Sequence, residues 1–403
     1  MSEAAARSQT ATLASLFISV FTALLGLGIV IPLLPVYADD MGASGLMIGL
    51  MVAGFSISRG VLQPFVGSLS DRQGRKRFMM VGLTIYTMVG LSFPLATVVE
   101  HLIIIRVVHG VGSAMIVPIA MSYVAGFAPQ GQEGRYMGML NVALFSGIGF
   151  GPVIGGVFRD NFGFNSAFYA MTAASVVSLL MVTVLLPADR PEERRFDVPP
   201  ILSTMRKMAG DVRVMGILLG RMSTMFVMVP LMAFLPLHME RFMSASGTQI
   251  GVVIAARTLT NAVLQFPFGG LVDRTSKVSL LVIGSLIVAA ATCTIPFLES
   301  FPALIAMFMV IGTGEALIWP TLGALATEEG RAYGHGSMMG VFNTAMSGGI
   351  LLGSLTGGIA ADVIGLKAVF PVIAGTLTVA TAASALMLTS RSRARTPAPI
   401  PAP

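Results

Sequence analysis

Long apolar stretches alternate with short polar intervals along the whole chain. Crossing the roughly 30 Å hydrocarbon core of a bilayer takes about 20 mostly apolar residues in a helix. Twelve stretches meet this requirement, and we expect helices at residues 12–36, 46–69, 78–98, 102–126, 136–158, 165–187, 214–238, 248–271, 278–298, 302–326, 336–360 and 366–389. The short segments of alternating polarity that a membrane barrel requires are absent from the sequence. The pattern therefore predicts an all-α membrane protein with twelve transmembrane helices.

The positive charges predict how the chain is oriented and divided. If the helices alternate in direction, 18 of the 25 Lys and Arg residues fall on the side that holds both termini. Cytoplasmic loops are enriched in these residues, so both termini are predicted to be cytoplasmic. The longest polar interval, at 187–213, predicts a cytoplasmic linker. It separates an N-terminal six-helix bundle at 1–186 from a C-terminal six-helix bundle at 214–390, and a cytoplasmic tail follows at 391–403.

Composition excludes most soluble proteins. The chain of 403 residues is 55% hydrophobic and 11% charged, whereas soluble domains carry about 25% charged residues. The single cysteine and the four scattered histidines show no metal-ligand spacing, and the net charge of +6 comes from short loops and not from one basic face. We therefore expect no metal, no cofactor and no nucleic acid. The expected partners of a monomeric chain are the lipid bilayer, protons and a small molecule.

The two halves of the chain repeat each other at one fixed offset. A shift of 202 residues superposes polar and glycine positions, which chance similarity of apolar helices does not explain. The matched pairs include Gln63 and Gln265, Gly67 and Gly269, Asp71 and Asp273, Arg72 and Arg274, Asn141 and Asn343, and Gly156 and Gly358. Two halves of the same orientation imply a pseudo-twofold axis along the membrane normal. A binding site is then expected between the halves, near the middle of the membrane.

The segment GSLSDRQGRK, from Gly67 to Lys76, is the strongest local motif. It resembles the signature loop of the major facilitator superfamily, in which Gly, Leu, Asp, Arg and a second Gly stand at fixed offsets before a basic pair. The Asp can face the positive N-terminus of a neighbouring helix, and the cations can bind acidic partners and lipid phosphates. A degraded second copy runs from Gly269 to Lys277, and Glu328 lies where the first half carries Gly126. We predict a cytoplasmic gate formed by Gly67, Asp71, Arg72, Gly74, Arg75, Lys76, Asp273, Arg274 and Glu328.

Two further motifs add to the resemblance, which covers nearly the whole chain through the twelve segments, the central linker and the repeat. Arg106, Gly110 and Gly112 look like the family's second motif, in which an arginine is linked to proton movement, although His109 stands where Gln is common. GFGPVIGG resembles the motif associated with antiporters, and its proline and glycines are expected to kink the helix and pack against a helix of the opposite half. Its predicted residues are Gly147, Gly151, Pro152, Gly155 and Gly156. GLGIVIPLLP, from Gly26 to Pro35, also looks like the twelve-helix drug:proton antiporter group. The resemblance implies the major facilitator fold of two pseudo-twofold-related bundles.

Glu315 is the only carboxylate well inside a predicted span. Desolvation makes an ionised carboxylate costly there, so Glu315 could take up and release a proton as access alternates. Trp319 lies four residues further on and shares its helix face, so the pair could present a carboxylate and an aromatic ring to an organic cation. The alternative is a structural carboxylate paired with Arg106, Arg221 or Arg257. Together with Arg106 and His109, Glu315 is our predicted proton-coupling set, although His109 is also read as a hydrogen-bonded packing residue.

Other polar and flexible side chains in the spans are candidates for a substrate cavity. Arg59 and Arg257 indicate either an anionic or amphiphilic substrate or the locking of helices together. Met225, Met228 and Met232 form part of a stripe that suits a cavity of broad specificity, or they fill space. The amides either bind a ligand or cross-link helices. The predicted cavity comprises Trp319, Arg59, Arg257, Met225, Met228, Met232, Gln63, Asn141, Asn261, Gln265 and Asn343.

These features together predict a secondary active transporter and not an enzyme, because the chain has no nucleotide-binding loop, HExxH motif or catalytic triad. We expect proton-coupled export of hydrophobic or amphiphilic molecules by alternating access, as in multidrug efflux. The alternative is a dedicated exporter or flippase of one amphiphile or metabolite, such as a lipid, a sugar or a siderophore. With no organelle signal in the sequence, a bacterial inner membrane is the expected location.

Overall fold

The computed structural model describes residues 3–127, 133–187, 206–272, 274–333 and 335–390. Most of the predicted linker and the whole predicted tail lie outside the described residues. The described chain is helical, with α1 (Glu3–Val30), α2 (Leu33–Asp40), α3 (Gly45–Gln73), α4 (Arg75–Ser92), η1 (Phe93–Leu95), α5 (Val99–Ala114), α6 (Val117–Phe127), α7 (Glu133–Phe162), α8 (Phe164–Leu185), α10 (Val212–Met243), α11 (Gly247–Val272), α12 (Lys277–Thr294), η2 (Ile295–Phe297), α13 (Phe301–Tyr333), α14 (His335–Val363) and α15 (Leu366–Thr389). Within it, 12 segments are long and apolar enough to cross a membrane, which confirms the predicted fold class.

Two spans that we predicted as single helices are broken. The first is divided into α1 and α2 at Ile31 and Pro32, and the fourth into α5 and α6 at Met115 and Ile116. Proline cannot donate to the carbonyl four residues earlier and also clashes with it. Pro35 therefore removes the bond to Ile31, and Pro118 removes the bond to Ala114, the last residue of α5. Each break follows from a proline placed just after it.

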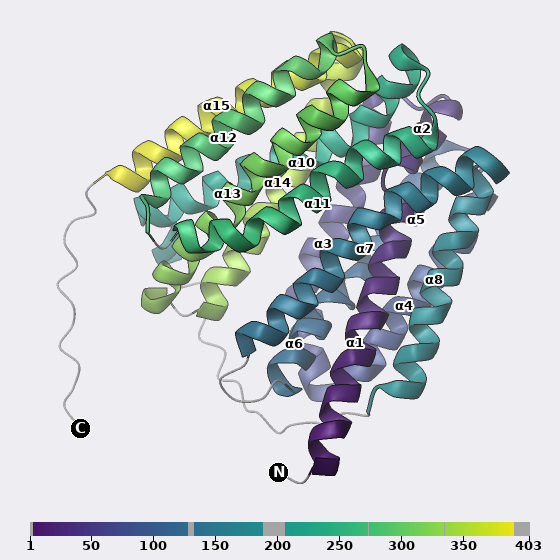
Figure 1. Cartoon of the computed structure of the whole chain (residues 1–403), viewed down its shortest axis with the longest axis vertical. Coiled ribbons are helices and arrows are strands. Elements are labelled where there is room, and N and C mark those ends of the chain that lie inside the picture. Colours follow the sequence, from purple (N-terminus) through teal and green to yellow (C-terminus); the bar gives the residue numbers. More distant parts are fainter. Residues whose placement is uncertain (1–2, 128–132, 188–205, 273, 334, 391–403) are drawn as a thin grey trace.

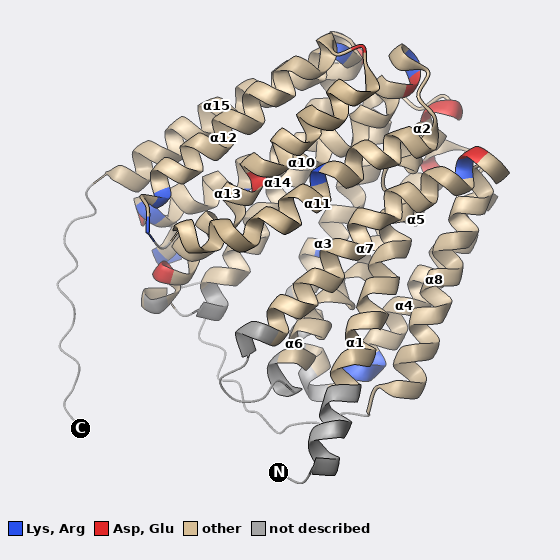
Figure 2. Cartoon of the chain, viewed as in Figure 1, with Lys and Arg blue, Asp and Glu red and all other residues tan. Residues whose placement is uncertain are grey.

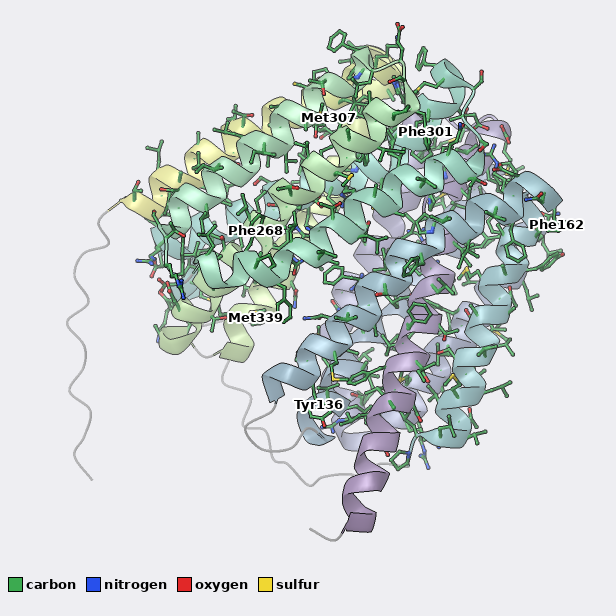
Figure 3. All side chains as sticks on the ribbon, in the orientation of Figure 1. Tyr136, Phe162, Phe268, Phe301, Met307 and Met339 are labelled. Carbon is green, nitrogen blue, oxygen red and sulfur yellow. The ribbon has the colours of Figure 1, made fainter. Side chains whose placement is uncertain are left out.

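Apolar side chains cover the outside of the molecule as well as its interior. In Figure 3 the drawn side chains project outward from the helices on the outside of the molecule, and Phe162 at the end of α7 is 74% exposed. In contrast, Figure 2 shows Lys, Arg, Asp and Glu mostly near the helix ends, with few in the middle. A soluble protein rarely exposes continuous apolar surface of this extent. The distribution is the one expected for a chain surrounded by lipid.

Helices α1–α8 and helices α10–α15 form two bundles that meet along two interfaces. In one interface α7 packs on α11, and in the other α3 packs on α14. The offset of 202 residues superposes α3 on α11 and α7 on α14. The two interfaces are therefore copies of each other, as a pseudo-twofold axis between the bundles requires.

The glycines along these interfaces show that the described parts of the bundles are in close contact toward one end and apart toward the other. Gly156 and Gly138 lie on one face of α7, because 18 residues are five turns and about 27 Å. A Cβ atom at Gly156 would overlap the backbone of Gly247 in α11, whereas one at Gly138 would meet no described atom within 4 Å. The equivalent pair in α14, Gly358 and Gly340, shows the same contrast. The bundles therefore separate toward the end at which α1 begins and α15 ends (Figure 1).

This contrast predicts opposite effects for one substitution at two sites. Gly156→Ala should lower the thermal stability of the purified protein, because overpacking a close contact costs about 1–3 kcal/mol. Gly138→Ala should leave it unchanged or raise it, since alanine is favoured over glycine in a helix by up to about 1 kcal/mol. Thermal unfolding in lipid nanodiscs measures both, and equal effects at the two sites would contradict the described geometry.

Candidate functional site

Two carboxylates connect the bundles at the end where they touch. Asp160, at the end of α7, accepts hydrogen bonds from the backbone N–H groups of Gly247 at 2.7 Å and Thr248 at 2.8 Å, which begin α11. Asp362, at the end of α14, accepts them from Gly45 at 2.6 Å and Leu46 at 2.8 Å, which begin α3. A helix N-terminus carries unpaired N–H donors and a partial positive charge, so each carboxylate caps a helix of the opposite bundle.

These two caps are themselves copies, since Asp160 and Asp362 differ by the repeat offset of 202 residues. Sequence analysis missed them, although the matched positions were visible in the repeat. Two ion pairs at the same end also cross between bundles, from Arg159 to Glu240 and from Arg241 to Asp39. The closed end is thus held by charge and hydrogen bonds as well as by glycine packing.

A buried ion pair lies inside the C-terminal bundle. The Nε atom of Arg257 in α11 lies 2.9 Å from Oε2 of Glu315 in α13, and the two side chains are 2% and 4% exposed. Helix α13 approaches α11 closely because Gly312 contacts the backbone of Arg257 with no side chain between them. Among the three arginines considered as partners, the structure therefore selects Arg257.

Of the two interpretations given for Glu315 from the sequence, this structure shows the carboxylate paired with an arginine. The carboxylate is paired with Arg257. The guanidinium carbon of Arg221 in α10 lies 5.5 Å from the centre of the Trp319 ring and 4.8 Å from that of Phe342. Both groups that were assigned to an organic cation already have a cation of the chain beside them.

Trp319 also lies where the two bundles meet. Its ring centre is 5.8 Å from that of Phe145 in α7, in the opposite bundle. Arg221 is half-buried in this region, and its Nη2 atom lies 3.1 Å from the sulfur of Met346. Sequence analysis named Arg221 only as a possible partner of Glu315. The sequence did contain a signal for this position. Arg221 lies inside an apolar run, and the spans contain no second carboxylate with which it could pair.

Arg106 and His109 lie within the N-terminal bundle. Nη1 of Arg106 is 3.2 Å from Nδ1 of His109, and the guanidinium lies 4.1 Å from the centre of the Phe55 ring. The two side chains are 6% and 0% exposed, and His109 meets the ring of Tyr86 edge to face at 4.5 Å. These contacts favour the packing interpretation of His109, while its role in proton coupling stays a prediction.

The other predicted cavity residues differ in exposure. Asn261 and Gln265 bond to each other along α11, and Asn261 is buried. Asn141 and Asn343 are exposed at equivalent positions in α7 and α14, and Gln63 and Arg59 in α3 are half-buried. Met225 and Met232 on α10 are buried, and Met228 is half-buried. Much of the methionine stripe is therefore packed in the protein interior.

The signature loop is built around one glycine and one lysine. Gly74 separates α3 from α4 with a φ of +99°, a conformation that favours glycine. Nζ of Lys76 donates to the carbonyl oxygens of Thr183 at 2.8 Å and Leu186 at 2.5 Å, at the C-terminus of α8. Asp273, the side chains of Asp71 and Arg72, and the surroundings of Gly67 lie outside the part of the chain that the structure describes. Arg75 follows Gly74 in α4 and is half-buried.

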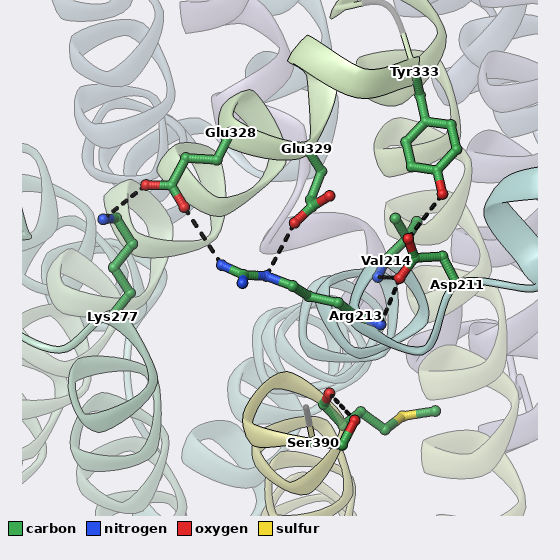
Figure 4. A network of polar contacts seen from close by, with 9 residues as sticks. Asp211, Arg213, Val214, Lys277, Glu328, Glu329, Tyr333 and Ser390 are labelled. Atoms are coloured by element: carbon green, nitrogen blue, oxygen red, sulfur yellow. Dashed lines mark hydrogen bonds and ion pairs between the residues drawn. The ribbon is translucent and has the colours of Figure 1, made fainter. Parts of the chain in front are cut away.

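In the second half, Glu328 occupies the position predicted for an acidic partner. Its carboxylate binds Lys277 at 2.9 Å and lies 3.7 Å from Arg213, which also pairs with Glu329 at 3.0 Å (Figure 4). This network connects the end of α13 to the starts of α10 and α12, all within the C-terminal bundle. Arg274 is exposed.

The antiporter-like motif packs differently from our prediction. A Cβ atom added at Gly147, Gly151 or Gly155 would overlap α1, which belongs to the same bundle. Gly149, Gly156 and the backbone of Pro152 and Val153 meet α11 of the opposite bundle. The reason is helical periodicity, because residues four apart share a face whereas Gly156 is turned about 100° from Gly155. The expectation that all four glycines face the opposite half is therefore corrected.

Comparison with known proteins gives the family. The profile of the Major Facilitator Superfamily matches residues 16–243 and 217–403. An uncharacterised MFS-type transporter of Methanocaldococcus jannaschii is 27% identical over 372 residues, which cover 90% of this chain and 96% of that protein. The quinolone resistance protein NorA of Staphylococcus aureus is 32% identical over 171 residues, or 42% of this chain and 44% of NorA, so that match spans less than half of either protein.

The fold agrees with solved transporter structures. The inward-facing, unoccupied crystal structure of a bacterial homologue of the human lysosomal transporter Spinster superposes with a TM-score of 0.79 at 14% identity. The match covers 96% of this chain and 98% of that chain. The chain therefore belongs to the major facilitator superfamily, and it is an integral, multi-pass membrane transporter and not an enzyme.

Proposed function

We propose that the protein exports hydrophobic or amphiphilic small molecules in exchange for protons, by alternating access between its two bundles. The cation-rich end at which α1 begins is assigned to the cytoplasm on the positive-inside rule, so the open end faces inward and both termini are cytoplasmic. We place the protein in a bacterial inner membrane. The name of NorA, quinolone resistance protein, supports drug efflux as the direction of transport.

The observation that carries the proposal is the buried pair of Glu315 and Arg257. In the inward-open arrangement the carboxylate is paired, as expected after its proton has left toward the cytoplasm. Protonation of Glu315 from the outer side would leave Arg257 unpaired in a poorly hydrated interior, which is costly. The proton and the conformation of α11 relative to α13 are thereby linked. Arg106 and His109 are retained as second members of the proton path.

Contacts at the outer and cytoplasmic ends of the bundles would stabilise the inward-open and outward-open states, respectively. The caps at Asp160 and Asp362 stabilise the inward-open state, because each contact exists only while the outer ends of the bundles touch. In the outward-open state we expect the signature loop to take over, with Asp71 at a helix N-terminus on the cytoplasmic side. The contacts of Lys76 and of Glu328 would keep in position the cytoplasmic helix ends that take part in this contact of Asp71.

The alternative is a transporter of one amphiphile or metabolite. It is favoured by the intramembrane arginines without carboxylate partners among the described residues, since a dedicated site would use them for one head group. A panel of substrates separates the two functions. Transport of several unrelated molecules supports efflux of broad specificity, whereas transport of an anionic lipid analogue alone supports the dedicated exporter.

We predict that Glu315→Gln abolishes uptake driven by an imposed pH gradient into proteoliposomes and leaves gradient-free exchange of substrate intact. Gln keeps the hydrogen bond to Arg257 but cannot carry a proton. Glu100→Gln, at an exposed position at the start of α5, is the matched control. The double variant Glu315→Gln with Arg257→Gln controls for misfolding. It also removes the buried charge of Arg257, which a glutamine at position 315 cannot neutralise. Gradient-driven uptake at the wild-type rate by Glu315→Gln would show that Glu315 is structural.

We predict that removing either outer cap shifts the protein toward the outward-open state. Asp160→Ala and Asp362→Ala should each cost about 1 kcal/mol of the inward-open state, roughly fivefold in population. Asn variants keep one acceptor oxygen and should fall in between. Spin labels at Thr97 and Glu299, exposed in equivalent loops, report the distance at this end once Cys293 is replaced by Ser. An unchanged distance distribution in both alanine variants contradicts a gating role.

A further inference from the structure

The buried polar groups in the middle of the spans are rich in hydrogen-bond donors. Nitrogen atoms of Arg59, Arg106, Arg221, Arg257, Asn261 and Trp319 are buried and lack a hydrogen-bond partner among the described residues. Within the described spans Glu315 is the acidic residue at this depth, and it is used by Arg257. An unpartnered N–H group in a poorly hydrated interior is costly, so a donor-rich interior favours a ligand that brings acceptors.

Two of these donors lie together at the contact between the bundles. Nε of Arg221 and Nε1 of Trp319 are both unpartnered, and the guanidinium lies 5.5 Å from the tryptophan ring. The side chains around them are apolar, since Phe342 and Met346 contact Arg221 and Phe145 contacts Trp319 from the opposite bundle. Arg221 and Trp319 are half-buried, so part of each remains accessible. The group combines a polar end of two donors with an apolar wall.

The depth and location of this group suit a substrate. Phe145 lies 11 residues before Gly156 on α7 and seven after Gly138, so it stands about 16 Å from the closed contact and about 10 Å from the open position. The contact between Phe145 and Trp319 thus lies between the closed contact and the open position. A ligand entering from the open end would reach Arg221 and Trp319 there.

The charge of the ligand follows from what already covers the rings. Arg221 occupies the faces of Trp319 and Phe342, so an organic cation would meet a positive charge where it needs a free ring. An anionic head group would instead receive hydrogen bonds from the guanidinium and the indole, and its apolar body would lie against Phe145 and Phe342. No described carboxylate lies within ion-pair distance of Arg221 to compete with it.

We propose that Arg221 and Trp319 form the head-group site for an anionic amphiphile, a molecule with a carboxylate, sulfonate or phosphate on an apolar body. This assignment rests on the proposed transport function for its physiological meaning, and it names the substrate class. Arg221 is the specificity-determining residue of the site. Trp319 contributes the second donor and one aromatic wall.

Trp319 is the only tryptophan of the chain, so its fluorescence reports binding at the site without any transport. The probes are a saturated fatty acid anion, its methyl ester and an alkyl trimethylammonium of equal chain length, titrated into protein in nanodiscs. We expect the anion to change the emission of Trp319 at concentrations about tenfold lower than the ester does, because hydrogen bonds to charged groups are the stronger ones. Equal responses to the three probes, or the strongest response to the ammonium, overturn the proposal.

Substitutions identify the residue responsible. Arg221→Gln should remove the preference for the anion over the ester and leave the affinity for the ester within about twofold, and Arg221→Lys should restore part of it because the charge remains. Arg206→Gln removes one exposed cation outside the spans and serves as the control. An unchanged preference in Arg221→Gln overturns the assignment of Arg221, and loss of ester binding as well indicates a structural role only.

Transport of the same three probes into proteoliposomes separates this proposal from the function. If the anion binds selectively but a pH gradient drives no uptake, proton-coupled export is wrong and the site assignment stands. If a pH gradient drives uptake of the ester and the ammonium but not of the anion, export is supported and the anion site is wrong. Gradient-driven uptake of the anion that Arg221→Gln lowers about tenfold supports both.

Discussion

The lipid interior cannot satisfy a hydrogen bond, and most of this structure follows from that constraint. Backbone groups have to be paired within each segment, so the chain becomes helical wherever it crosses the membrane. The same constraint acts on side chains. Arg257 forms an ion pair with Glu315, Lys76 donates to carbonyl groups at the end of α8, and Asp160 accepts from the first N–H groups of α11. Each of these contacts also fixes one helix against another, so the polar groups determine where the packed helices sit.

The sequence repeat places matching contacts at the two interfaces between the bundles. Because the halves match at one offset, the contacts at Gly156 and Asp160 between α7 and α11 recur at Gly358 and Asp362 between α14 and α3. In the proposed alternating access, two equivalent interfaces on either side of an axis would close together and open together. Contacts made by glycine and by helix caps suit this motion, since they hold only at short range and leave no long side chain entangled when the helices separate.

The sequence predicted the spans well because hydropathy and length alone determine them. It did not predict the breaks before Pro35 and Pro118, since a proline in a membrane helix produces either a kink or a break. The partner of Glu315 stayed open among three arginines, because the choice depends on which helices approach closely. That approach is decided at Gly312, whose meaning appears only when α13 is seen against α11. The rotation of about 100° per residue in a helix likewise explains why Gly155 and Gly156, adjacent in the motif, contact different bundles.

Arg221 and Arg257 show how one residue type serves opposite purposes in the same interior. Both are guanidinium groups in the C-terminal bundle, within apolar helices. Arg257 has a carboxylate and is 2% exposed, so its charge is balanced within the chain and it is the arginine proposed for proton coupling. Arg221 has aromatic rings and a sulfur atom beside it and remains partly accessible at the contact between the bundles. Rings stabilise a cation without neutralising it. An unneutralised cation at the contact between the bundles attracts an anion from outside the chain, so the proposed coupling site and the proposed head-group site would use different arginines of the same bundle.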